Sequence, residues 1–379
     1  MKKILLSLIL VTSFSLVVQS QTVNDQLNPL ITGVPSLSIA PDSRAGGMGD
    51  VGAATTPDVN SQHWNPAKYA FMESEAGVSV SYTPWLSKLV SDIDLAYLAG
   101  YWKFDPRQSV SASLRYFSLG EITLTNDQSV DQGIAKPNEF AIDIAYSRLL
   151  SDKFSAAVAF RYIRSDLNNG INLTGGEQMY PGNSVAADVA GYFRTPIALE
   201  TGDGTLALGL NISNIGSKIS YDDFLTSNFI PTNLRFGGSF DYPIDSYNKI
   251  SVSADLNKLL VPTQNNMTTA EYSDISLLSG IFKSFSDAPG GAKEELREIM
   301  WSVGAEYAYN NQFFVRGGYF NESQYKGNRK YFTAGAGFKL NVFQLDAGYV
   351  ISTSQSNPLD QTLRFSLSFD LFGLKNLVK

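Results

Sequence analysis

The sequence predicts an all-β protein, a fourteen-stranded antiparallel transmembrane β-barrel with an N-terminal plug segment. Three observations lead to this fold class: an export signal at the N-terminus, short segments in which apolar and polar residues alternate, and connections that are alternately short and long. Because successive side chains of a strand point to opposite faces, each such segment has one apolar and one polar face. In an outer-membrane barrel the apolar face contacts lipid and the polar face lines the lumen.

Composition agrees with this class and excludes several others. Of the 379 residues, 12% are aromatic, which suits the aromatic girdles of barrels, and 17% are charged, which is low for a soluble surface. Beyond the N-terminus no apolar run reaches about 18 residues, so helical membrane spans are not expected. The absence of cysteine excludes a lipoprotein anchor, disulfides and thiol catalysis. The formal net charge of −7 argues against nucleic acid as a partner.

Residues 1–20 have the features of a secretory signal peptide. Lys2 and Lys3 form a charged n-region, Ile4–Val18 form an apolar h-region, and a small residue, Ser20, precedes the expected cleavage site. We expect residues 21–75 to form the N-terminal segment and plug, residues 76–372 the barrel, and residues 373–379 a C-terminal extension.

A glycine-rich segment precedes the first strand and is the candidate plug. Its motif residues are Arg44, Gly46, Gly47, Gly49, His63, Trp64, Asn65 and Pro66. Glycines allow close backbone approach and Asn65-Pro66 favours a turn, so the segment can fold inside a barrel without becoming a strand. The glycines do not predict a phosphate-binding loop, because neither a preceding βα unit nor a Walker lysine is present.

Fourteen alternating segments follow the plug. The predicted strands are Ala76–Pro84, Asp92–Phe104, Gln108–Leu119, Asn138–Leu150, Lys153–Ser165, Ser184–Arg194, Thr205–Ser213, Thr232–Tyr242, Lys249–Asn257, Ile299–Tyr309, Gln312–Asn321, Lys330–Leu340, Val342–Thr353 and Gln361–Leu371. Bacterial barrels have an even strand number, short periplasmic turns and long outer loops. The longest connection, Lys258–Glu298, is therefore expected outside the cell, with a short helix over Ala292–Met300.

Charged residues occupy the polar faces of these strands. The alternation turns Arg115, Asp143, Arg161, Arg235, Asp241, Glu306, Arg316, Asp346, Arg364 and Asp370 inward. Such charges either line a transport path or pair into a packed, structural lumen, and we favour pairing.

Apolar residues in the long loops are candidates for a partner-binding surface. They are Trp85, Leu86, Phe224, Leu225, Phe229, Ile230, Ile281, Phe282 and Phe285. Exposed apolar patches mark interaction sites and aromatics are favoured at interface cores. The alternative is that these residues pack the loops against each other or belong to the outer aromatic girdle.

Enzyme chemistry is not expected. The single histidine, His63, lies in the candidate plug, where a structural hydrogen bond is the simpler role, and no Gly-x-Ser-x-Gly elbow is present. One histidine, no cysteine and scattered carboxylates do not indicate a metal site. No catalytic residue, metal ligand or cofactor is predicted.

The string RAGGMGDVGAATTPDVNSQHWNPAKYA, followed by fourteen strands, resembles the FadL-like outer-membrane family. In that family a plug with an Asn-Pro-Ala motif fills a fourteen-stranded barrel. The segment around His63–Tyr69 is similar to the PorV (LptO) branch, which serves the type IX secretion system of Bacteroidetes.

The resemblance implies a cargo shuttle in the outer membrane, in contact with its lipid and lipopolysaccharide. Such a barrel binds the C-terminal signal domain of secreted cargo, takes the cargo from the translocon barrel SprA (Sov) and delivers it to the sortase PorU and its attachment complex. The alternative is transport of hydrophobic small molecules, as in the fatty-acid branch. In that case Gly237-Gly238 or Gly317-Gly318 would mark a kink in the wall, although close packing explains glycines there equally well.

Overall fold

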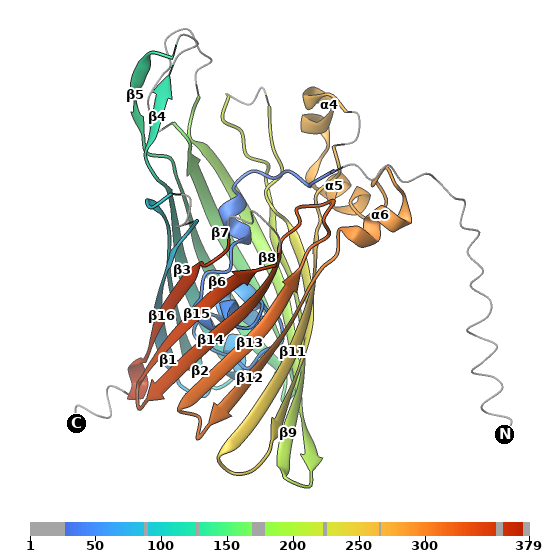
Figure 1. Cartoon of the computed structure of the whole chain (residues 1–379). Helices are drawn as coiled ribbons and strands as arrows, with labels where there is room; N and C mark the ends of the chain where they lie inside the picture. Colours follow the sequence, from blue (N-terminus) through green and yellow to red (C-terminus); the bar gives the residue numbers. More distant parts are fainter. Residues whose placement is uncertain are drawn as a thin grey trace, which may run out of the picture.

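The computed structural model describes residues 27–86, 90–125, 129–168, 179–222, 226–264, 267–353 and 359–373. Within these ranges fourteen antiparallel strands close into a barrel, in the order β1-β16-β15-β14-β13-β12-β11-β10-β9-β8-β7-β6-β3-β2 (Figure 1). The barrel strands are β1 (Ala76–Pro84), β2 (Ile93–Asp105), β3 (Gln108–Leu119), β6 (Asn138–Ser151), β7 (Phe154–Asp166), β8 (Gly182–Leu199), β9 (Gly202–Gly216), β10 (Asn233–Pro243), β11 (Asn248–Leu259), β12 (Met300–Tyr309), β13 (Phe313–Asn321), β14 (Lys330–Leu340), β15 (Phe343–Ser352) and β16 (Leu363–Asp370). The predicted fold class is confirmed.

The remaining elements lie in the N-terminal segment and the long loops. They are η1 (Pro35–Ser38), α2 (Ser43–Gly46), α3 (Ser61–Trp64), η2 (Pro66–Phe71), the hairpin β4 (Ile122–Thr125) and β5 (Asp131–Ala135), α4 (Thr269–Asp274), α5 (Leu277–Lys283) and α6 (Ala292–Arg297). The β4–β5 hairpin and α4–α6 stand at the same end of the barrel, opposite the short turns (Figure 1). Long loops mark the extracellular end. In the described part of the chain, each helix is too short or too polar to cross a membrane.

The predicted strands agree with the observed ones except near one turn. Between β8 and β9 the backbone stays paired as far as Leu199 and Gly202, whereas the prediction ended the first of these strands at Arg194. Pro196 lies within this extended pairing and has no backbone N–H group. Beyond Arg194, whose amide donates to the Lys153 carbonyl at 2.8 Å, β8 pairs only with β9, and such an edge tolerates a residue without an N–H group.

The strand faces are distributed as a membrane barrel requires. On β12, burial alternates at every residue, with Ser302 and Glu306 buried and Val303 and Tyr307 exposed. Polar side chains therefore point into the lumen, and apolar side chains point outward to the hydrocarbon.

The N-terminal segment fills the lumen (blue in Figure 1) and lies directly against wall glycines. A Cβ atom at Gly209 would overlap the carbonyl of Ala53, and one at Gly318 would overlap the backbone of Met48. At Gly237 a Cβ atom would overlap the Asp255 carboxylate and the Ala53 side chain, and β10 keeps an unbroken register with both neighbours. Close packing against the plug, and not a kink, accounts for the inward glycines.

Candidate functional site

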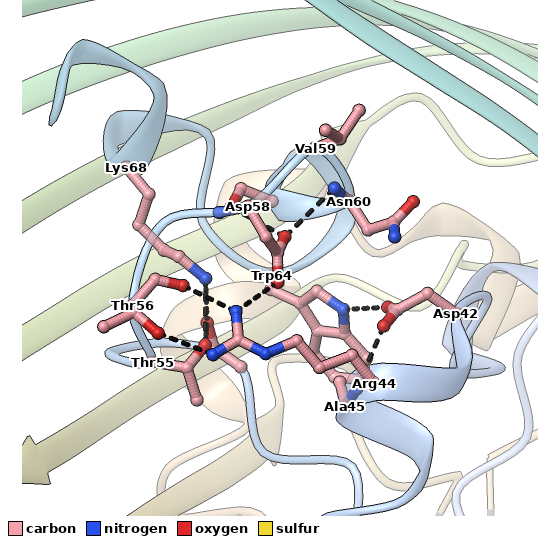
Figure 2. A network of polar contacts seen from close by, with 12 residues as sticks. Asp42, Arg44, Ala45, Thr55, Thr56, Asp58, Val59, Asn60, Trp64 and Lys68 are labelled. Carbon is pink, nitrogen blue, oxygen red and sulfur yellow. Dashed lines mark hydrogen bonds and ion pairs between the residues drawn. The ribbon is translucent and has the colours of Figure 1, made fainter. Parts of the chain in front are cut away.

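Arg44 anchors the plug to the barrel wall. It belongs to α2, whose N-terminus is capped by Asp42, which accepts a hydrogen bond from the Ala45 amide at 2.9 Å. From this helix the Arg44 guanidinium contacts Asp58 of the plug at 2.7 Å (Figure 2). It also donates to Glu306 of β12, with Nη2 3.1 Å from Oε1 and Nε 3.2 Å from Oε2. One side chain therefore joins two plug segments to the wall.

Glu306 extends this contact into a chain of ion pairs across the wall. It accepts a hydrogen bond from Arg316 Nε of β13 at 2.6 Å, and Arg316 Nη1 donates to Asp346 of β15 at 2.6 Å. The three wall side chains are at most 4% exposed. Removing one member of a buried ion pair leaves the other charge uncompensated, which typically costs about 3–5 kcal/mol.

A second ion pair holds the turn that follows α2. Arg364 of β16 donates to Asp50 at 2.6 Å, and the Tyr331 hydroxyl donates to the same carboxylate at 2.6 Å. Gly49 precedes Asp50 with φ +72°, and its amide donates to Thr333 at 2.7 Å. Gly46 leaves room for the Arg364 side chain, because a Cβ atom there would overlap the guanidinium.

The remaining motif glycine, Gly47, allows the plug to lie against the wall. A Cβ atom on it would come within 3.0 Å of the Gly335 Cα atom of β14. Two glycines face each other here, so backbone approaches backbone.

The Asn-Pro-Ala motif forms a capped turn. The Asn65 side chain accepts a hydrogen bond from the Ala67 amide at 3.1 Å, and Pro66 occupies the first turn of η2. The amide group of Asn65 donates to the carbonyl of Ala53 at 2.9 Å and to that of Gly191 on β8 at 3.0 Å. Asn65 thus satisfies two buried carbonyl groups, one in the plug and one in the wall.

Trp64 and His63 are adjacent residues of α3 in the plug. The Trp64 indole donates to Asp42 at 2.6 Å (Figure 2), and the Arg235 guanidinium lies 4.4 Å from the centroid of its ring system. His63 packs edge-on to Trp64 and accepts a hydrogen bond from Arg115. Burial, together with the charges of Arg115 and Arg235, holds the pKa of His63 well below its usual range, so the imidazole is neutral.

Six of the ten predicted inward charges form ion pairs, as favoured from the sequence: Glu306, Arg316, Asp346 and Arg364, described above, and Asp143 with Arg161. Arg161 contacts Asp143 at 2.7 Å and Asp188 at 3.0 Å. At the periplasmic rim Asp370 accepts a hydrogen bond from Ser74 at 2.6 Å. A cavity of about 70 Å³ lies between the plug and the wall, and its lining includes residues of β9, β10 and β11 as well as of β12 and β13. Among the described residues, no group of three or more histidine and carboxylate side chains is placed to hold a metal ion.

The candidate loop residues divide into buried and exposed groups. Phe229 and Ile230 are each 1% exposed, so they pack loops and do not form a free surface. Trp85 and Leu86 are half-buried against the apolar cluster around Phe320. Phe282 and Phe285, by contrast, are 74% and 49% exposed, while Ile281 is half-buried. Phe224 and Leu225, like the signal peptide and residues 374–379, lie outside the described residues.

Two exposed leucines extend the outer surface beyond the predicted residues. Leu278 of α5 is 63% exposed and Leu296 of α6 is 69% exposed. Leu278 and Phe282 are four residues apart, so they lie on one face of α5. We call Leu278, Phe282, Phe285 and Leu296 the α5–α6 surface. That spacing was visible in the sequence, but only the structure distinguishes this exposed face from the buried loop residues.

A cluster of opposite charges fixes α6 to the barrel rim. Lys258 of β11 contacts Glu298 at 2.6 Å and Glu295 at 3.1 Å. Lys326, in the loop between β13 and β14, contacts Glu294 at 2.6 Å and Glu298 at 3.0 Å. The lysines and carboxylates are at least partly buried, so the α5–α6 surface stands on a fixed base.

These features define a class: an outer-membrane β-barrel of the FadL-like fold whose lumen is occupied by an N-terminal plug. The TodX ΔS2S3 mutant, a monoaromatic hydrocarbon channel, is similar over 86% of this chain and 98% of its own, with 11% identity and a TM-score of 0.53. The toluene transporter TodX of Pseudomonas putida matches over 91% and 99% (11% identity, TM-score 0.48). A FadL homologue of Pseudomonas aeruginosa also matches over 91% and 99%, with 10% identity and a TM-score of 0.44. At such identities the first of these comparisons supports the fold alone.

The sequence matches the family described as Type IX secretion system protein PorV over residues 21–266. The chain therefore belongs to the PorV family and is an outer-membrane component of the type IX secretion system. No curated protein matches it in the sequence comparison.

Proposed function

We propose that this barrel binds the C-terminal signal domain of secreted cargo, takes the cargo from the translocon and delivers it to the cell-surface sortase and attachment complex. The observation that carries the proposal is the exposed α5–α6 surface at the extracellular end. Apolar side chains grouped on a fixed support are characteristic of protein-binding sites. A shuttle must release its cargo, which suits a modest interface with a few aromatic anchors.

The support beneath this surface favours recognition of a folded partner. Gly280 of α5 lies against the ring of Phe229, and Phe229 packs edge-on to Tyr272 of α4. The ion pairs of Lys258 and Lys326 hold α6. A surface that is ordered before binding loses less conformational entropy when the partner arrives.

The alternative function is transport of hydrophobic small molecules. The polar character of the lumen argues against it, because the plug is joined to the wall through charged side chains such as Arg44 and Arg364. The cavity beside the plug is small and includes three arginines in its lining. Apolar ligands prefer predominantly apolar pockets. We infer also that the barrel does no chemistry, since the Nδ1 atom of its single histidine, His63, already accepts a hydrogen bond from Arg115 and is not free to take a proton.

The test is co-purification of native partners with variants of the outer surface. Phe282→Ser with Phe285→Ser removes both exposed aromatic rings, and each variant carries an affinity tag in detergent-solubilised outer membranes. We expect cargo that retains its C-terminal signal domain to be recovered at least tenfold less than with the unchanged chain. The matched control is Ile134→Ser in the β4–β5 hairpin, an apolar residue that is 52% exposed at the same end of the barrel.

Each result has a clear meaning. Loss of cargo with the α5–α6 variant but not with Ile134→Ser supports the proposal. Equal cargo recovery from all three proteins would overturn the assignment of this surface. Recovery of lipids or aromatic hydrocarbons with the unchanged barrel, and of no cargo at all, would favour the transporter.

A further inference from the structure

The cavity beside the plug is rich in positive charge. Its lining includes Arg161, Arg235 and Arg329, with Asp50 as the single carboxylate. Three of these four residues have partners of opposite charge: Arg161 contacts Asp143 and Asp188, Arg329 contacts Glu322, and Asp50 contacts Arg364. Arg235 is the exception.

Arg235 presents a buried donor without an acceptor. Within the described ranges no carboxylate forms an ion pair with it, and its Nη1 atom is buried without a hydrogen-bond partner. The guanidinium lies 4.4 Å from the ring centroid of Trp64. This cation–π contact uses the face of the guanidinium, so its N–H groups do not gain an acceptor from it. Arg235 is half-buried, and Asp255, Asp50 and Asp42 act on its charge without accepting a hydrogen bond from it. The Nη1–H group therefore still lacks an acceptor, and a bound anion would supply one.

His63 supplies a second donor to the same cavity. Arg115 Nη2 lies 3.0 Å from His63 Nδ1, and a guanidinium can only donate. Nδ1 is therefore the acceptor, and the proton of the neutral ring is on Nε2. His63 Nε2 is buried without a partner. Both His63 and Arg235 pack on Trp64, so the two unsatisfied donors flank one indole ring.

The volume of the cavity fits a small polyatomic ion. A single water needs roughly 10–15 Å³ of such space, whereas the cavity measures about 70 Å³. We propose that it binds a small oxyanion of the carboxylate or phosphate class. Arg235 supplies the charge and a hydrogen bond, and the Nε2–H group of His63 supplies the second hydrogen bond. Charge-assisted bonds of this kind are shorter and stronger than bonds to water.

The bound ion would have a structural consequence. It would join His63 of the plug to Arg235 of β10, two residues that meet only through Trp64 in the present contacts. The plug would then be held to β10 by an anion, as Arg44 holds it to β12 and Asp50 holds it to β16.

The single histidine of the chain makes the site directly observable. The mature protein, purified in detergent through a tag without histidine and labelled with 15N-histidine, gives imidazole signals from His63 alone. Sodium phosphate, and in a second series sodium acetate, is titrated at neutral pH. Sodium gluconate, whose chain is too large for the cavity, keeps the ionic strength constant.

We expect the Nε2–H tautomer in the free protein and a saturable shift of its proton and nitrogen signals with phosphate or acetate. Arg235→Gln should abolish the shift. Arg194→Gln is the matched control, because Arg194 also stacks on a plug aromatic, Phe71, at 4.5 Å but does not line the cavity. This control should titrate like the unchanged chain.

The proposal fails if neither anion shifts the His63 signals saturably, or if gluconate shifts them equally. It also fails if Arg235→Gln and the unchanged chain respond alike. Should Arg235→Gln not fold, the titration of the unchanged chain decides alone. Arg235→Lys, which keeps the charge but has fewer donors, should then bind at least tenfold more weakly.

Discussion

Arg44 of the plug and Glu306 of β12 are 262 residues apart in the chain, yet their side chains form two hydrogen bonds inside the barrel, at 3.1 and 3.2 Å. Glu306 also accepts a hydrogen bond from Arg316, and Arg44 also donates one to Asp58, so the pair lies at the junction of a plug network and a wall network. Withdrawal of the plug would leave charges of both networks buried without partners. The plug is therefore a fixed part of the barrel and not a loosely held domain.

Loss of this junction should loosen the plug without opening the barrel. Arg44→Gln removes the charge that Glu306 and Asp58 share, and we expect plug packing to lose about 3–5 kcal/mol. The plug should become sensitive to trypsin, and conductance in planar bilayers should rise. Arg148→Gln, at an exposed position near a short turn, is the control. Wild-type conductance and protease resistance in Arg44→Gln would contradict the anchoring role.

A double-mutant cycle separates the pair from its surroundings. If Arg44 and Glu306 act on each other, Arg44→Gln combined with Glu306→Gln should cost less than the sum of the two single changes. Strict additivity would mean that the two residues stabilise the plug independently.

Two adjacent glycines of β13 provide a test of close packing. A Cβ atom at Gly318 would overlap the Met48 backbone, whereas one at Gly317 has its nearest neighbour, the Thr333 carbonyl, at 3.8 Å. Gly318→Ala should therefore displace the plug at a cost of about 1–3 kcal/mol. The measurement is the temperature at which half of the protein no longer migrates on a gel as the folded barrel, and this temperature should fall. Gly317→Ala should leave that temperature unchanged. If both variants behave alike, the inward glycines are not needed for close packing of the plug against the wall.

The α6 anchor should respond to acid. Burial alone raises the pKa of Glu294, but hydrogen bonds from Lys326 and the Gly290 amide outweigh it and lower the pKa below its ordinary 4.5. A lowered carboxyl pKa stabilises the folded loop above that value, and the contribution is lost as pH falls through the folded pKa. A spin label at Lys293→Cys, unique because the chain has no cysteine, should become more mobile as the pH falls through the lowered pKa of Glu294.

In the Lys326→Met variant we expect acidification to change the mobility of the label in the opposite direction. Without the lysine, Glu294 and Glu298 repel each other at neutral pH, so acidification should decrease the mobility of the label. A label whose mobility does not change with pH in either protein would show that these ion pairs do not hold α6.

Much of the fold could be predicted from the sequence, because apolar and polar residues alternate along each strand. Every strand of a membrane barrel needs this pattern, since one face contacts lipid and the other faces the lumen. The plug was visible as well, since Gly49 and Asn65-Pro66 are local conformational signals. Tertiary partners were not. Nothing near Arg44 in the sequence indicates Glu306, and a hydrophobic loop residue such as Phe229 is indistinguishable from Phe282 until the loop is folded. Burial in loops depends on contacts between distant segments, which alternation does not encode.

Phe229 and Phe282 should therefore behave in opposite ways when each is replaced by alanine. Phe229 is 1% exposed and packs on Tyr272 and α5, so its removal leaves a cavity, which typically costs about 3–5 kcal/mol in a core. In Phe229→Ala, protease should cleave the α4–α5 loop while the barrel still migrates in its heat-modifiable folded form. Phe282 is 74% exposed, so Phe282→Ala should keep the loop resistant to protease and lose only partner binding. A protease-sensitive loop in Phe282→Ala, or a resistant one in Phe229→Ala, would reverse the roles assigned to the two rings. The distinction matters because loss of cargo binding in Phe229→Ala reports an unfolded loop, whereas the same loss in Phe282→Ala reports a contact.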